Sequence, residues 1–117
     1  MDLTKLKSLS LNLTEINSLN EEFGYLSLLE DLRLVNMSLD KFPTSIAYLS
    51  SLVKLYIHKS DLKSIPEWVF SLPNLQHLEI TESELDTISP RIGEMGELTL
   101  VMFDNNRLKS LPEEMKF

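Results

Sequence analysis

The 117-residue sequence predicts an α/β solenoid, in which a short strand and a helical turn alternate in every repeat. The first observation is that Leu55 and Ile57 show the period of two that is typical of a strand. The second is that Ile65 and Val69 follow four residues apart, as on a helical turn. The third is that the whole pattern returns every 23 residues, which indicates stacked repeats. A single strand and turn cannot bury their own apolar side chains, so each repeat needs a neighbour on both sides.

The repeats follow one another without insertion or deletion and form one predicted domain over residues 1–117. They span residues 6–28, 29–51, 52–74, 75–97 and 98–117. Position 1 of each repeat is leucine, at Leu6, Leu29, Leu52, Leu75 and Leu98. Positions 4, 6, 11, 14 and 18 are apolar in all five copies as well, which predicts a continuous buried column.

This pattern, L-x-x-L-x-L-x-x-N-x-L-x-x-L-P-x-x-I-x-x-L, resembles the leucine-rich repeat in its short 23-residue variety, known from bacterial and signalling proteins. The resemblance covers residues 6–117. It implies a right-handed superhelical arc with a parallel sheet on the concave face and short helical or 3-10 turns on the convex face. It also implies protein–protein interaction through the concave face.

Two positions vary between the repeats. Proline follows position 14 in repeats 2, 3 and 5, whereas repeat 4 has Pro90 one place later, so we expect its convex segment to follow a different path. Position 9, usually asparagine in the family, reads Thr14, Met37, Ser60, Ser83 and Asn106. Because methionine donates no hydrogen bond, we expect the first two turns to be looser than the last two.

Composition excludes several classes of function. The net charge of −7 argues against nonspecific nucleic-acid binding, which needs a basic surface. The absence of cysteine excludes thiol chemistry and thiolate metal sites. No apolar run approaches the ~18 residues of a membrane span, so we expect no membrane insertion. The polar start is not a signal peptide, which favours the cytoplasm without fixing the compartment.

Positions 3, 5, 7 and 8 are expected to form the concave surface. Equal positions on adjacent strands lie about 4.8 Å apart, so Asp31 faces Lys54, and Tyr56 lies between Arg33 and Glu79. Exposed charged pairs of this kind usually satisfy one another and contribute little. The alternative is a partner-binding site, since Tyr and Arg are frequent at interface hot spots. The candidate partner-binding residues are Arg33, Lys54, Tyr56, His58, His77 and Glu79.

We expect neither a metal, a cofactor nor catalysis. His58 and His77 are separated by four residues and one strand spacing, roughly 14 Å, which is too far to share a zinc ion. The three glycines form no phosphate-binding loop, and no Ser-His-acid grouping converges under the repeat register. The chain is therefore not expected to be an enzyme.

The last strand presents a second feature. Its outward residues Leu100 and Met102 are apolar, and its backbone edge has no partner within the array, so we expect self-association there.

The concave residues and the family resemblance give the primary hypothesis, which is a module that binds a protein partner on the concave sheet. The alternatives are a structural unit that oligomerises through this uncapped C-terminal repeat, and the recognition fragment of a larger receptor or effector.

Overall fold

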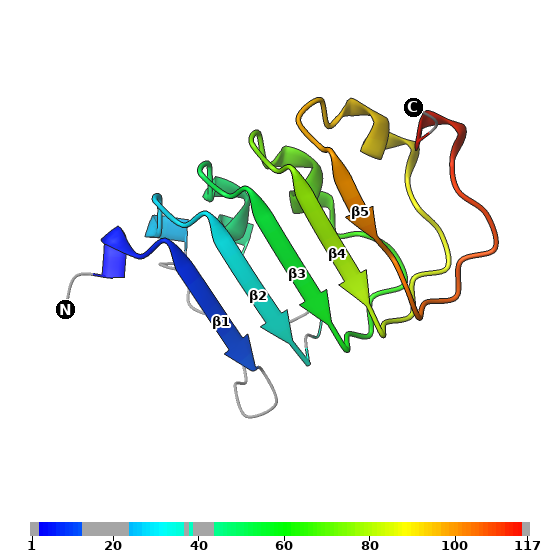
Figure 1. Cartoon of the computed structure of the whole chain (residues 1–117), viewed down its shortest axis with the longest axis horizontal. Coiled ribbons are helices and arrows are strands. Elements are labelled where there is room, and N and C mark those ends of the chain that lie inside the picture. Colours follow the sequence, from blue (N-terminus) through cyan, green and yellow to red (C-terminus); the bar gives the residue numbers. More distant parts are fainter. Residues whose placement is uncertain (1–2, 13–23, 37, 39–43, 116–117) are drawn as a thin grey trace.

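The computed structural model describes residues 3–12, 24–36, 38 and 44–115. Five parallel strands form one sheet in sequence order (Figure 1). They are β1 (Ser8–Asn12), β2 (Asp31–Val35), β3 (Lys54–His58), β4 (His77–Thr81) and β5 (Leu100–Met102). β1 to β4 each occupy positions 3–7 of their repeat, and equal positions pair across every strand boundary. The predicted α/β solenoid and its 23-residue register are confirmed.

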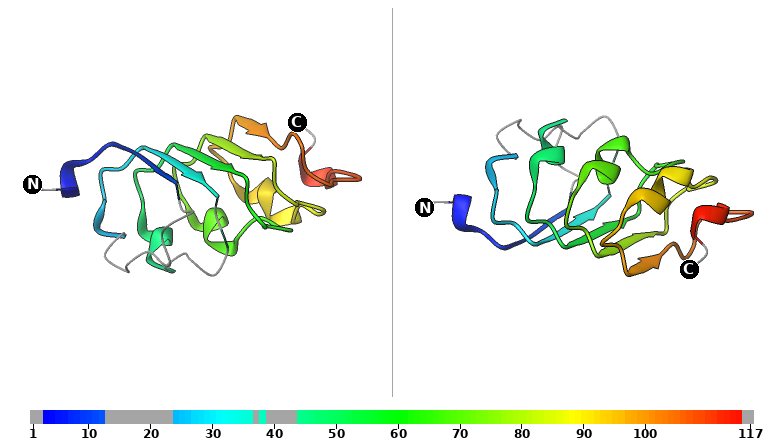
Figure 2. Two further views of the ribbon diagram at one scale, coloured as in Figure 1. Left: turned by 90° about the horizontal axis from the view of Figure 1, so that it is seen from below. Right: turned by 90° about the horizontal axis from the view of Figure 1, so that it is seen from above.

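Short 3-10 helices lie on the face opposite the sheet (Figure 2). They are η4 (Thr44–Tyr48), η5 (Glu67–Ser71) and η6 (Pro90–Glu94), with η1 (Leu3–Lys5) and η7 (Glu113–Met115) near the two ends. All three central helices occupy positions 16–20, so the different path expected for repeat 4 is wrong. Pro66 is the N-cap of η5, whereas Pro90 is the first residue of η6 and the Ser89 side chain caps it by accepting from the Arg91 backbone amide. The one-residue shift thus changes the cap and leaves the helix at the same positions.

The core is the predicted column of inward side chains. Leu32, Leu55 and Leu78 are fully buried at position 4, and position 6 is buried in the same three repeats. Each such side chain contributes roughly 1.5–3 kcal/mol through the hydrophobic effect. Leu9 and Val101, at position 4 of the first and last repeats, are only half-buried. The column is thus closed in the middle and open at both ends.

A left-handed residue follows the strand in each of the four repeats whose position 8 the structure describes. Asn36, Lys59, Glu82 and Asn105, all at position 8, have φ angles of 60°, 57°, 50° and 58°. This residue turns the chain from the sheet towards the convex side. Asparagine tolerates the conformation well, whereas lysine and glutamate are strained there by their side chains. The apolar repeat pattern does not predict this turn, although asparagine at position 8 in repeats 2 and 5 is a signal for it.

Position 9 carries a hydrogen-bond ladder in the last three repeats. The Ser60 hydroxyl donates to the Ser83 hydroxyl at 2.7 Å, and Ser83 donates to a backbone carbonyl of its own repeat at 3.0 Å. The Asn106 amide donates to backbone carbonyls in repeats 4 and 5 and accepts from a backbone amide of repeat 4. Thr14 and Met37 lie outside the described residues, so the looser first turns stay a prediction.

Candidate functional site

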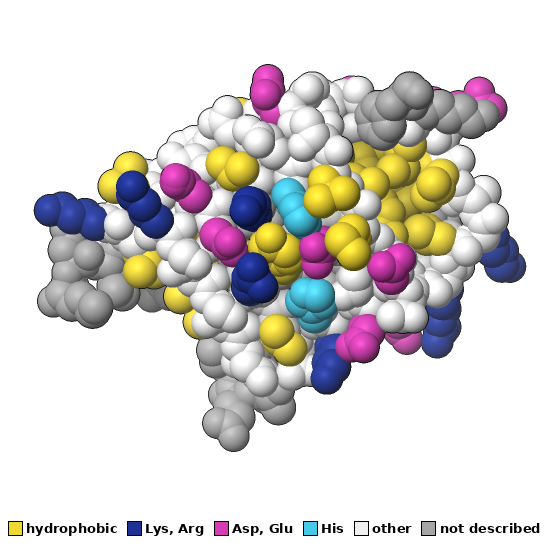
Figure 3. Space-filling model, in the orientation of Figure 1, with side chains coloured by type: hydrophobic (Ala, Val, Ile, Leu, Met, Phe, Trp, Pro, Cys, Tyr) yellow, Lys and Arg dark blue, Asp and Glu magenta, His cyan; other side chains and the backbone are white. Residues whose placement is uncertain are grey.

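The register aligns the concave side chains in rows across the strands. The first row is Ser8, Asp31, Lys54, His77 and Leu100. The central row is Ser10, Arg33, Tyr56, Glu79 and Met102. The third row is Asn12, Val35, His58 and Thr81. All six candidate partner-binding residues lie on β2, β3 and β4 in these rows, and Figure 3 shows charged and histidine side chains gathered there.

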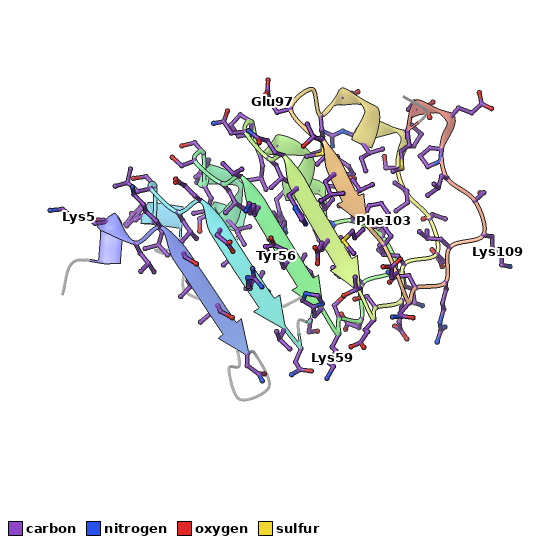
Figure 4. All side chains as sticks on the ribbon, viewed as in Figure 1. Lys5, Tyr56, Lys59, Glu97, Phe103 and Lys109 are labelled. Carbon is purple, nitrogen blue, oxygen red and sulfur yellow. The ribbon has the colours of Figure 1, made fainter. Side chains whose placement is uncertain are left out.

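Tyr56 is the buried residue at the centre of this surface. Tyr56 is only 7% exposed, and the Arg33 guanidinium on β2 lies 4.2 Å from its ring centroid. The His77 ring on β4 also lies against it, with the centroids 5.0 Å apart and the planes tilted by 47°. A cation–π contact of this kind contributes about 0.5–1 kcal/mol. Tyr56 therefore holds its neighbours in place, and Arg33 presents the exposed group. Figure 4 shows Tyr56 in the middle of the sheet.

Both histidines turn towards one carboxylate. His77 Nε2 lies 2.8 Å from Glu79 Oε1, and His58 Nε2 lies 4.0 Å from Glu79 Oε2. The other ring nitrogen of His58, Nδ1, hydrogen-bonds the Thr81 hydroxyl at 2.5 Å. The rings are thus closer together than the roughly 14 Å expected from their backbone positions. That expectation measured strand spacing and left out the reach of the side chains, so it missed the convergence on Glu79.

The two histidines and Glu79 do not form a metal-binding site. Among the residues that the structure describes, no group of three or more His, Asp or Glu side chains is placed to hold a metal ion. The described helices also include none that is both long and apolar enough to cross a bilayer. The hydrogen bond to Glu79 restrains the His77 ring, and the hydrogen bond to the Thr81 hydroxyl restrains the His58 ring.

Asp31 pairs along its own strand. Its Oδ1 lies 3.5 Å from Arg33 Nε, although the register places Asp31 beside Lys54 as expected. At this length the contact is an ion pair without a hydrogen bond. Lys54 is exposed and takes part in none of the ion pairs found among the described residues. Asp31 and Lys54 line a shallow open hollow of about 280 Å³ together with Glu30 and Val53.

The last strand presents apolar side chains beside this polar centre. Leu100 is 46% exposed and Met102 is 37% exposed, at the ends of the first and central rows. Figure 3 shows this apolar area next to the charged and histidine side chains. Among the described residues, β5 has a strand neighbour on one side only, so its concave side chains lack the cover that β2 and β4 give to Tyr56. Its role in self-association stays a prediction.

Comparison with known proteins finds leucine-rich repeats both among family models and among solved structures. A family model for leucine-rich repeat regions matches residues 1–116. Among solved structures, a leucine-rich repeat protein of Leptospira interrogans is similar, with a TM-score of 0.75 and 23% sequence identity. The leucine-rich repeat domain of the type III effector XopL is also similar, with a TM-score of 0.69 and 19% identity. At these identities the two structures support the fold alone.

The extent of these matches differs between the proteins. The first structure covers 97% of this chain, and the second covers 94%. This chain spans 29% of the length of the first protein and 49% of the second. A search of curated protein sequences found no match. The family model supports a leucine-rich repeat scaffold, and the two structures support its fold.

Proposed function

Because the chain belongs to the leucine-rich repeat family, we propose that it binds a protein partner on the concave face of its sheet. The family supports a protein-interaction module in general, and the concave centre is the site that we assign to it. The observation that carries the proposal is the stacked position of Arg33 over the buried ring of Tyr56.

This stacking prepares Arg33 for binding. The contact with Tyr56 and the ion pair with Asp31 restrict the side chain, while 52% of it remains exposed to a partner. An arginine that is already ordered loses less conformational entropy on binding than a free one. Arginine and tyrosine are also enriched at interface hot spots. Arg33 is therefore the residue whose loss we expect to weaken binding most.

The size of the sheet limits the affinity. Five strands at about 4.8 Å span only about 20 Å, whereas a standard interface buries about 800 Å² on each partner. A partner must therefore use most of the concave face, from the polar centre to the apolar side chains of β5. We expect moderate affinity that depends on a few central residues.

The test is affinity capture with the purified chain as bait, followed by identification of the bound protein and measurement of its affinity. Arg33→Glu should weaken binding at least about tenfold, because it replaces an exposed donor with an acceptor. Lys63→Glu is the matched control, since Lys63 is exposed and lies outside the strand rows. Equal binding by the wild type and Arg33→Glu would remove the concave site.

Self-association through the last repeat is the second candidate function. The exposure of Leu100 and Met102 beside the free edge of β5 favours it, because such an edge is a template for another strand. Sedimentation velocity at micromolar concentrations tests it. Met102→Lys should abolish the oligomer, and Arg33→Glu should leave it intact. A monomer at every concentration would refute this candidate.

A further inference from the structure

We propose that the concave face selects an extended peptide segment in which an acidic residue and a large apolar residue stand four positions apart. This inference rests on the proposed function above and specifies the chemistry of the partner. It follows from three features of the described strands: which charged groups face outwards, where the apolar side chains lie, and how far apart the two regions are.

The groups that face outwards on β2 and β3 are hydrogen-bond donors. The side chain of Arg33 is 52% exposed, and Lys54 is exposed as well. The acidic side chains sit lower, with Asp31 24% and Glu79 16% exposed. Each of these carboxylates already contacts a side chain on the same strand, Arg33 and His77 respectively. A partner therefore meets donors first, and a carboxylate is the side-chain group that accepts from arginine most strongly.

This local pattern differs from the charge of the whole chain. The net charge of −7 repels an acidic partner at long range, but that repulsion is screened over about 8–10 Å at physiological ionic strength. The contacts at Arg33 and Lys54 act at hydrogen-bond distance, where screening is small. We therefore infer selectivity from the local donors and slow association from the overall charge.

The apolar requirement comes from β5. Met102 lies in the same row as Arg33, and Leu100 lies in the same row as Lys54. Both β5 side chains are exposed on the concave side. A large apolar side chain of the partner that covers them gains hydrophobic free energy in proportion to the area removed from water.

The spacing of the two regions selects the conformation of the partner. Arg33 and Met102 are three strands apart, which is about 14 Å at 4.8 Å per strand. In an extended chain, residues four positions apart face the same way and lie about 13–14 Å apart. A helix brings residues to one face at about 10.5, 12 or 16.5 Å, after seven, eight or eleven residues. The extended segment therefore matches the spacing of about 14 Å more closely than a helix does.

The middle of the row adds a restriction. The partner residue halfway between the acidic and apolar residues faces Tyr56 and Glu79, which separate Arg33 from Met102. A second acidic side chain there would meet the Glu79 carboxylate and be repelled. We therefore expect one acidic residue at the Arg33 end and a small neutral residue at the midpoint.

Synthetic fluorescein-labelled peptides test the inference by fluorescence polarisation with the whole chain. The reference peptide is Gly-Ser-Asp-Ser-Thr-Ser-Leu-Ser-Gly, accompanied by its reversed sequence because the geometry fixes the spacing and leaves the direction open. The better-binding direction should bind at least about tenfold more tightly than its Asp-to-Asn form, and more tightly than forms with spacings of two, three or seven. Equal binding by the Asp and Asn forms, or tightest binding at a spacing other than four, would overturn the inference.

Protein variants connect this preference to the two regions. The Arg33→Glu variant should no longer bind the reference peptide, and it should bind a peptide in which lysine replaces the aspartate. The Met102→Lys variant should bind peptides with leucine or serine at the apolar position equally well. Lys63→Glu should bind as the wild type does. If Arg33→Glu showed no reversal while its fold was intact by circular dichroism, the acidic contact would be refuted.

The proposed function and this inference fail in different ways. A captured protein that depends on Arg33, together with no peptide preference, overturns the peptide chemistry and keeps the concave site. Capture that is indifferent to Arg33 removes the concave site itself. Tight self-association that Met102→Lys abolishes, without any peptide competition, would assign the apolar side chains of β5 to a second copy of the chain and overturn the inference.

Discussion

The middle and the last coil of this solenoid have nearly the same sequence pattern and very different environments. In β3, Leu55 and Ile57 are fully buried, and even the concave Tyr56 is covered by its neighbours. In β5, Val101 is half-buried and Met102 is exposed on the concave side. The residue types are similar, so the difference comes from having one adjacent strand in place of two. Burial in a solenoid is a property of the stack.

The same contrast appears on the convex side. Ile65 and Leu111 both occupy position 14, yet Ile65 is buried and Leu111 is exposed. The position-9 side chains compensate for this in part, because the Asn106 side chain makes two hydrogen bonds to the backbone of repeat 4. The last coil is thus held by polar contacts and by partly buried apolar side chains against one neighbour, whereas the middle coils pack against two. The following changes separate these contributions.

The largest expected effect is the loss of a core side chain in the middle coil. Leu55→Ala should lower the free energy of unfolding by about 2–5 kcal/mol, because it leaves a cavity that both adjacent coils line. Val101→Ala, at the same position in the half-buried last coil, should cost about 1 kcal/mol. Urea unfolding followed by circular dichroism measures both. Equal losses would show that the stack is as closed at β5 as at β3.

The second effect concerns the polar attachment of the last coil. Asn106→Ala should cost about 1–3 kcal/mol, since it leaves a backbone amide of repeat 4 and several carbonyls without their partner. Asn74→Ala is the matched control in a middle coil, because Asn74 makes one exposed hydrogen bond to a backbone carbonyl. It should cost less than 1 kcal/mol by the same measurement. A larger loss for Asn74→Ala would contradict the role given to Asn106.

The third prediction tests whether the last coil can shift to relieve steric crowding. A Cβ atom on Gly93 would lie 2.7 Å from Glu114 Cβ, so Gly93→Ala must displace η7. Crowding of this kind typically costs about 1–3 kcal/mol, and we expect about 1 because no further coil covers η7 among the described residues. Gly96→Ala has open space around it and should be neutral. A loss above 3 kcal/mol for Gly93→Ala would show that the last coil is rigid.

Sequence reasoning reached the fold and the rows because both depend on the repeat register alone. The alternation at Leu55 and Ile57 fixed which side chains point inwards, and the 23-residue shift fixed which ones are neighbours. It did not reach the burial of Tyr56 or the meeting of both histidines at Glu79. Those features depend on side-chain torsions that bring neighbouring groups together across strands, and no periodic pattern encodes them.

The apolar repeat pattern also does not predict the left-handed turn at position 8 of the last four repeats, and this turn supplies the smallest predicted effect. Lys59 holds φ at 57° in the middle coil, where Asn105 holds 58° in the last one. Asparagine tolerates this conformation better than lysine, so Lys59→Asn should raise the free energy of unfolding by about 1 kcal/mol. Lys59→Gln removes the same charge without suiting the turn and should leave stability unchanged. Asn105→Lys should lose about what Lys59→Asn gains. Because the backbone φ angle is nearly the same in both coils, the gain at Lys59 and the loss at Asn105 should be equal, even though the middle coil has two neighbours and the last has one. Unequal changes in the free energy of unfolding would show that the last coil relaxes the strain at its turn.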